Sequence, residues 1–297
     1  METTWIIKEM SDNMYTKHDQ LYKELIRTFF EEFLAAFFPE VHEYLDVKTV
    51  TPLSEEVYTD VLEGKTRRLD LVMEAKVKGT DALVIVHIEP QSYVDRQFHE
   101  RMFRYFSLLY NEYRKPIIPI TVFSYESDWE EYEYKMEFPF FRVLTFNYLT
   151  LHLKKQNWRK YIRSNNPAAA ALMSRMNYTE EERVQVKKEF LRMIVRMKLD
   201  PARERLIYGF FETYLKLNEK EEEMLMREIE KLPEADEIFE IPISYEEKGK
   251  EIGKEIGKEL GKKEVAKELL REGLSLEFIA KVTKLDEEEI KELKKEM

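Results

Sequence analysis

The chain contains no cysteine among its 297 residues. This absence excludes disulfide bonds and thiolate metal sites, and it fits a reducing compartment such as the cytoplasm. Long apolar runs are also missing, because no segment approaches the roughly 18 uncharged apolar residues that a membrane-spanning helix needs. The first residues lack the basic-then-apolar order of a secretory signal. We therefore expect a cytoplasmic protein with no membrane partner.

Positive charges are fewer than negative ones, since 48 Lys and Arg stand against 59 Asp and Glu and give a net charge of −11. An acidic protein has no general attraction for nucleic acid, so a nucleic-acid enzyme of this composition would need a local basic surface or a bound metal. Hydrophobic residues make up 43% and aromatic residues 13%, which is enough for a sizeable core. The length suits one large domain or two smaller ones.

The most informative stretch is residues 67–92, which predicts two apolar strands joined by a turn at Lys78-Gly79-Thr80-Asp81. A turn centred between Gly79 and Thr80 places Asp70 opposite Glu89. Because side chains alternate along a strand, one face of this hairpin is wholly apolar. The other face carries Asp70 and Glu89, with Gln91 just beyond. A slip of one residue would push carboxylates into the core, so the pattern supports this register.

Two carboxylates opposite each other on a sheet have Cβ atoms about 5 Å apart and repel each other. A divalent cation between them would remove that repulsion. Carboxylate oxygens, completed by phosphate and water, are how proteins hold Mg²⁺ at phosphate chemistry. A solvated pair of surface acids on an ordinary hairpin is the alternative, and the hairpin alone leaves both interpretations open.

The elements around the hairpin predict a mixed α/β sheet with helices packed on it. An amphipathic helix with an aromatic stripe comes first. Asp19 and Lys23 flank its stripe, either as an i,i+4 ion pair or as groups facing a site. Ser92 with Asp95 has the spacing of a helix start. The expected elements are a helix at 15–38, a strand at 47–61, a helix at 95–113, and strands at 117–124 and 141–153 separated by a loop at 126–139.

After residue 157 the strand pattern stops. Three helical segments are expected at 158–176, 179–199 and 202–232, with a capping box at Thr179 and Pro201 starting the third. A linker follows at 233–245, and then a helix with glycine at every fourth position and a helix-turn-helix-like tail. Residues 246–297 carry 13 Lys and Arg against 15 Asp and Glu. Since this segment is not basic, we favour protein contact over DNA contact there, including self-association.

The combination of a helix, a three-strand meander, a helix and a further strand resembles the PD-(D/E)XK nuclease superfamily. Asp70 lies on the second strand of that meander, and Glu89-Pro90-Gln91 ends the third. Within the superfamily, the chain looks most like the recombination-promoting nuclease, YhgA-like family. The resemblance covers residues 15–155 well and the glycine-repeat tail more loosely. It implies a restriction-endonuclease-like α/β domain at 15–156, followed by a helical extension at 157–232.

The resemblance also implies an activity, namely DNA endonuclease chemistry with Mg²⁺ or Mn²⁺, tied to recombination or a mobile element. In this interpretation the metal ligands are Asp70 and Glu89, with Asp19, or else Glu24, adding an oxygen from the first helix. The water is placed by Gln91, the scissile phosphate faces Lys23, and the DNA contacts Arg101 and Tyr105.

The chain departs from the superfamily at Gln91, where lysine is usual. Glutamine can hydrogen-bond a water molecule but cannot supply a cation. Lys23 is the better substitute, because Lys76 lies roughly 20 Å along the strand from Asp70. Two other functions stay open. The chain is either a weak or inactive nuclease-fold module that binds DNA or protein, or a helical interaction protein acting through its tail.

Overall fold

The computed structural model describes residues 20–53, 56–59, 66–68, 71–91, 94–125 and 133–241, with single positions between 266 and 283. The chain divides into two compact units, residues 1–241 and 242–297. The expected glycine-repeat helix and tail therefore lie almost wholly outside the described residues. The domain boundaries after residues 156, 232 and 245 stay predictions.

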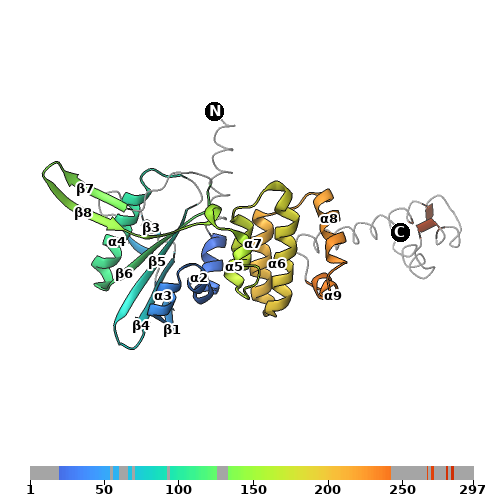
Figure 1. Cartoon of the computed structure of the whole chain (residues 1–297), viewed down its shortest axis with the longest axis horizontal. Helices are drawn as coiled ribbons and strands as arrows, with labels where there is room; N and C mark the ends of the chain where they lie inside the picture. The colour runs from blue at the N-terminus through green and yellow to red at the C-terminus, as the bar shows by residue number, and fades with distance from the viewer. Residues whose placement is uncertain are drawn as a thin grey trace. The chain divides into compact units, whose positions relative to one another are not determined.

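A five-stranded mixed sheet forms the centre of the first unit, in the order β1-β4-β5-β6-β9 (Figure 1). The pairs β1·β4 and β4·β5 are antiparallel, whereas β5·β6 and β6·β9 are parallel. The helix α4 makes the crossover that a parallel pair requires. The predicted mixed sheet flanked by helices is confirmed. Its elements are β1 (Leu45–Pro52), β4 (Leu71–Val77), β5 (Leu83–Gln91), α4 (Phe98–Tyr113), β6 (Ile117–Phe123) and β9 (Leu149–His152).

The predicted hairpin register is confirmed for each described pair of β4 and β5, from Leu71 opposite Ile88 to Lys76 opposite Leu83. Gly79 has a φ of +75° in the turn, a conformation that glycine adopts without strain. Asp70 itself lies outside the described residues. The strand expected at 47–61 is wrong in part, since β1 ends at Pro52 and a separate pair follows it. That pair is β2 (Glu56–Thr59) with β3 (Thr66–Arg68).

Both faces of the hairpin are covered, which separates its side chains into two environments. Val84, Val86 and Ile88 of β5 lie in the main core, which the N-terminal helices complete. Val72 and Ile85 face the opposite way and are buried under Tyr105 and Leu109 of α4. Because side chains alternate, residues 87, 89 and 91 belong to the α4 face. The predicted apolar core face of the hairpin is thereby confirmed, and the opposite face lies against α4.

The N-terminal helix is not continuous, contrary to the expected single helix at 15–38. The helical segment 20–28 ends at Phe29, and α2 (Phe30–Phe37) and α3 (Pro39–Tyr44) follow. Phe38 has φ −137° and ψ 61°, as the residue before a proline is driven out of the helical region. Pro39 then starts a new helix, a position where its missing N–H costs nothing.

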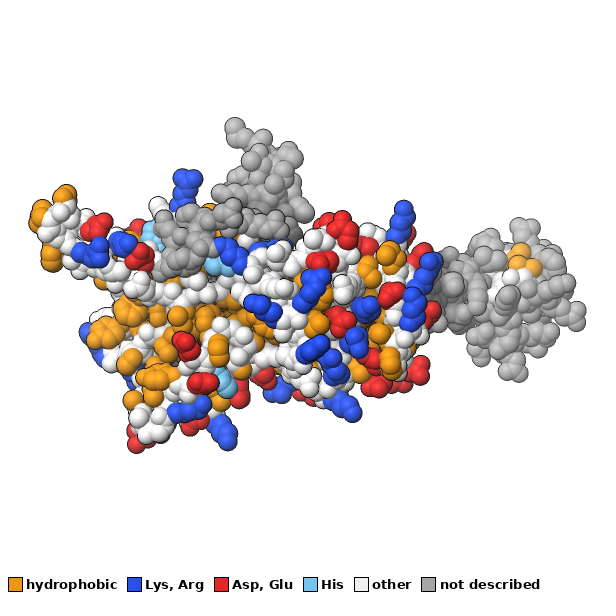
Figure 2. Space-filling view, viewed as in Figure 1, with side chains coloured by type: hydrophobic (Ala, Val, Ile, Leu, Met, Phe, Trp, Pro, Cys, Tyr) orange, Lys and Arg blue, Asp and Glu red, His pale blue; other side chains and the backbone are white. Residues whose placement is uncertain are grey.

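The stretch expected as a loop at 126–139 contains a strand instead. β7 (Glu133–Phe138) pairs with β8 (Phe141–Asn147) in a separate hairpin, which projects beyond α4 in Figure 1. Its base packs on α4, with the Phe106 and Phe146 ring centroids 5.0 Å apart. Its end leaves Phe140 88% exposed. Hydrophobic side chains gather at the tip of this hairpin in Figure 2. The strand expected at 141–153 therefore divides into β8 and β9.

The base and the tip of this hairpin should differ in their effect on stability. Phe146 is 7% exposed and contacts α4, so Phe146→Ala should lower the free energy of unfolding by about 3 kcal/mol. Phe140→Ser removes an exposed ring and should change it by less than about 0.5 kcal/mol. Urea unfolding followed by circular dichroism measures both. Equal destabilisation by the two variants would contradict the packing described.

A helical layer completes the first unit and shares its core, as the Tyr22 and Phe210 rings lie 5.0 Å apart. The capping box at Thr179 and the helix start at Pro201 are confirmed. The helix expected at 202–232 is interrupted, because Asn218 caps a second helix. The helices are α5 (Pro167–Leu172), α6 (Arg183–Met197), α7 (Pro201–Tyr214), α8 (Glu219–Ile229) and α9 (Ala235–Phe239).

Two expected segments of this layer differ in the structure. The first, 158–176, contains α5 flanked by the short 3₁₀ turns Trp158–Lys160 and Met173–Arg175 rather than one helix. The second, the linker at 233–245, contains α9. Ile238 and Ile241 are 5% and 8% exposed, so their burial holds the chain against the core up to residue 241.

Candidate functional site

Glu89 and Gln91 end the central strand β5 and are 5% and 3% exposed. Since β5 runs parallel to β6, the carboxyl ends of both strands meet at one edge of the sheet, where open α/β sheets bind ligands. The backbone is fixed there. Thr121 Oγ1 donates to the Glu89 carbonyl at 2.9 Å, and the Ser124 N–H donates to the Gln91 carbonyl at 3.0 Å.

The Glu89 carboxylate lies between a histidine and an arginine. His87 Nε2 is 3.5 Å from Glu89 Oε2, and Arg101 Nε is 3.9 Å from Glu89 Oε1. His87 is fully buried, and its ring meets Tyr105 edge-on with centroids 5.9 Å apart. A carboxylate this deeply buried needs polar or charged partners. His87 and Arg101 face the two oxygens of this carboxylate, at distances longer than a hydrogen bond.

Arg101 also joins Gln91 to Asp95. Its Nη2 donates to Gln91 Oε1 at 2.7 Å, and its Nη1 donates to Asp95 Oδ2 at 2.5 Å. Asp95 was expected inside the helix as an acid of its first turn, and this is wrong because α4 begins at Phe98. Asp95 instead accepts a hydrogen bond from the Gln97 N–H at 2.9 Å and holds the turn before the helix.

A tyrosine from the neighbouring strand end completes the cluster. Tyr125 follows β6 and is 9% exposed. Burial, together with the negative charge of Asp95, raises the pKa of Tyr125 to about 12. The phenol therefore keeps its proton at neutral pH and can donate a hydrogen bond.

The structure brings together three of the expected site residues, Glu89, Gln91 and Arg101. Tyr105 is 8% exposed and packs against His87 beneath Glu89. Lys23 is half-buried on the segment 20–28. Asp19 and Asp70 lie outside the described residues. The roles assigned to all of these residues stay predictions.

Three residues of the cluster were not predicted as site residues, namely His87, Asp95 and Tyr125. His87 was visible in principle, since it precedes Glu89 by two positions and so shares its face. Asp95 and Arg101 are six residues apart, which is no helical contact spacing, so their pairing could not be read from the sequence. Tyr125 reaches the site only through the parallel pairing of β5 and β6, which a sequence does not specify.

The donors present suit a hard cation only in part. The Glu89 carboxylate is an oxygen ligand of the kind that Mg²⁺ prefers. Within the described ranges, no three His, Asp or Glu side chains are grouped so that they could hold a metal ion. The other predicted ligands, Asp70 and Asp19, lie beyond those ranges.

The fold and the cluster define a mixed α/β protein with a buried acid and amide and a half-buried arginine at the carboxyl edge of its central strands. The sequence model of the family described as "Putative transposase, YhgA-like" matches residues 16–223, and the chain belongs to this family. The resemblance to the YhgA-like family drawn from the sequence is thus confirmed. No curated protein and no solved structure matches the chain. Among the described helices, none is long and apolar enough to cross a membrane.

Proposed function

We propose that the chain is a metal-dependent DNA endonuclease of a mobile-element or recombination system. One observation carries the proposal. A buried carboxylate, Glu89, ends the central strand of a mixed sheet beside Gln91 and Arg101, in a chain of a transposase family. Buried acids held between specific partners at a strand end are typical of functional sites.

In this proposal Asp70 and Glu89 bind Mg²⁺ or Mn²⁺, and Asp19 adds an oxygen from the first helix. The bound metal lowers the pKa of water and stabilises the leaving oxygen of the phosphodiester. Gln91 places the attacking water, and Lys23 faces the scissile phosphate. His87 orients the Glu89 carboxylate, as partners behind a metal ligand commonly do.

The bound cation would also reduce the repulsion between an acidic nuclease and DNA. A net charge of −11 repels DNA at long range. A divalent ion at the site, together with Arg101, offsets the negative charge of the carboxylates where the phosphate must approach. We therefore expect DNA binding that depends on the metal and falls with added salt.

The test uses the full chain with supercoiled plasmid and MgCl₂ or MnCl₂. We expect nicking only with metal, and Asp70→Ala should cut at least about 100-fold more slowly, since it removes a ligand of the metal. Isothermal titration calorimetry of the metal alone should show binding that Asp70→Ala weakens.

Equal cutting by the wild type and Asp70→Ala would point to a contaminating nuclease and reject these assignments. No cutting and no metal binding by the wild type would favour the module that binds DNA or protein without cleaving it.

A further inference from the structure

Gln91 is oriented by a charged neighbour. Its Oε1 accepts the hydrogen bond from Arg101 Nη2 at 2.7 Å. A guanidinium only donates hydrogen bonds, so the amide oxygen, and not the nitrogen, must face it. The two N–H bonds of the amide consequently point away from Arg101. Gln91 therefore presents donors on the side that does not face the arginine.

Arg101 is itself held in place from several directions. Asp95 Oδ2 lies 2.5 Å from Nη1, Glu89 Oε1 lies 3.9 Å from Nε, and the Phe98 ring lies 5.0 Å from the guanidinium carbon. The side chain is 22% exposed. Arginine stays charged at any working pH, and its planar fork suits such a fixed arrangement.

We propose that Gln91 and Arg101 together supply the hydrogen-bond donor and the positive charge that a single lysine at position 91 would supply. Gln91 gives the hydrogen-bond donor that holds the attacking water, and Arg101 gives the positive charge behind it. A hydrogen bond from a cation to the amide oxygen polarises the amide and strengthens its N–H donors. Arg101 acts as a positioning residue, in contact with Gln91 rather than with the reacting atoms. This inference rests on the proposed nuclease function.

The hydrogen bond between Gln91 and Arg101 changes which residue compensates for the missing lysine. The sequence favoured Lys23, a cation on the helical segment 20–28. Arg101 needs no movement to serve, because it already contacts Gln91 and the strand end that carries Glu89. The hydrogen-bond donor of the site thus comes from Gln91 on β5, and the positive charge comes from Arg101 on α4.

The test moves the charge from position 101 to position 91 and measures plasmid nicking with Mg²⁺. Arg101→Gln should lower kcat about 10- to 100-fold, the usual loss for a residue supporting a site. Gln91→Lys alone should also be slow, since two cations then meet and the hydrogen bond is lost. The double variant Gln91→Lys with Arg101→Gln should cut at least tenfold faster than Arg101→Gln.

The matched control is Arg104→Gln, which removes an exposed arginine three residues further along α4 that pairs with Glu100 at 2.8 Å. It should stay within twofold of the wild type.

The pairing is also measurable without turnover. In ¹⁵N-labelled protein, the side-chain amide signal of Gln91 should shift in Arg101→Gln and stay in place in Arg104→Gln. The inference would be overturned if the double variant were no faster than Arg101→Gln, or if Arg101→Gln were as fast as the wild type. The proposed nuclease function would survive either result, provided that Asp70→Ala still cut more slowly than the wild type. Absence of metal-dependent cutting by the wild type would overturn both.

Discussion

Glu89→Gln should slow plasmid cleavage by more than about 1000-fold with little change in melting temperature. The substitution keeps the shape and the hydrogen-bonding reach of the side chain but removes the charge that would hold the metal. Loss of a partner behind a ligand costs about 10- to 100-fold, and loss of the ligand itself should cost more. Arg101 keeps Asp95 as a counter-ion at 2.5 Å, so the fold should survive.

The control for this variant is Glu74→Gln. Glu74 lies on β4, and its side chain is 18% exposed and pairs with Lys115. The sequence predicts that Glu74 shares a face of this strand with Asp70, because side chains alternate along a strand. We expect nicking within about threefold of the wild type, because Glu74 pairs away from the end of β5. A Glu89→Gln enzyme that retained a tenth of the wild-type rate would show that this carboxylate does not hold the metal.

The metal contribution can be separated from folding in the same experiment. Calorimetric titration with Mn²⁺ should show binding by the wild type and by Glu74→Gln, and much weaker binding by Glu89→Gln. Melting curves recorded without metal should be close for the three proteins. If Glu89→Gln melted at a far lower temperature, its lost activity would reflect unfolding. The assignment of Glu89 as a metal ligand would then depend on the calorimetric titration alone.

The central hairpin could be predicted from the sequence in detail, because two local signals agree. Gly79 permits the turn, and strict alternation of apolar residues fixes the register, since any slip would bury a charge. The strand pattern therefore also placed Glu89 and Gln91 on one face at the end of a buried strand.

The surroundings of these two residues could not be predicted so well. The contacts of Arg101 join residues six and ten positions away along the chain, and they exist only because α4 starts later than its apparent cap suggests. β7 was missed because its charged residues are typical of a loop, whereas its pairing with β8 and its packing on α4 stabilise a strand. Tertiary packing decides such segments, and sequence pattern alone does not.

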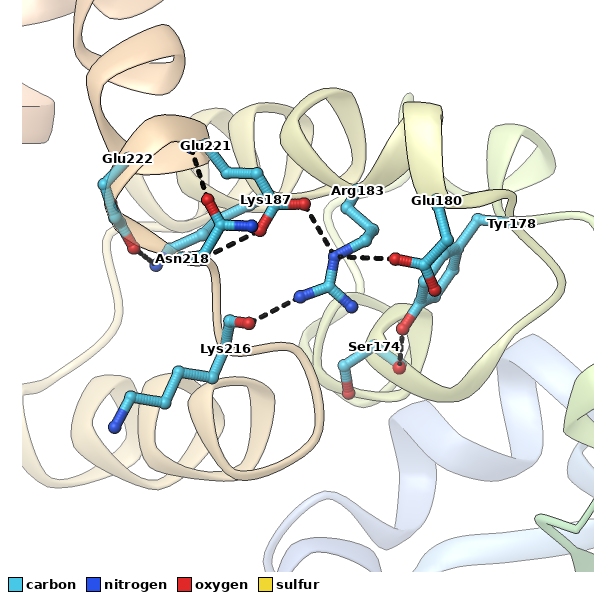
Figure 3. A network of polar contacts seen from close by, with 9 residues as sticks. All are labelled: Ser174, Tyr178, Glu180, Arg183, Lys187, Lys216, Asn218, Glu221 and Glu222. Atoms are coloured by element: carbon cyan, nitrogen blue, oxygen red, sulfur yellow. Dashed lines mark hydrogen bonds and ion pairs between the residues drawn. The ribbon is translucent and has the colours of Figure 1, made fainter.

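The helical layer contains a buried charge cluster whose disruption should be costly. Lys187 of α6 is 4% exposed and donates to Glu222 of α8 at 2.7 Å, as Figure 3 shows, and it lies 2.9 Å from Glu212 of α7. One cation thus joins three helices. Removing one partner of a buried ion pair is costly, because the remaining charge is left without compensation.

Lys187→Ala should therefore lower the free energy of unfolding at neutral pH by about 3 kcal/mol. This figure is the lower end of the usual range, because the Glu222 side chain is 43% exposed and partly solvated. Its neighbour provides the control. Lys188 pairs with Glu228 at 3.2 Å near the surface, so Lys188→Ala should cost less than about 1 kcal/mol. Urea unfolding gives both values, and similar losses would contradict the importance of burial.

The pH dependence distinguishes this ion cluster from simple packing. Burial lowers the pKa of Lys187 and the two carboxylates raise it, and the carboxylates prevail, so its pKa lies above the ordinary 10.5. A raised pKa in the folded state means that the stabilisation is complete below the unfolded pKa and is lost as pH rises through the folded value. The advantage of the wild type over Lys187→Met should therefore hold from pH 7 to about pH 10 and shrink at higher pH. An advantage that stayed constant across this alkaline range would mean that Lys187 stabilises the helices through its hydrocarbon chain and not through its charge.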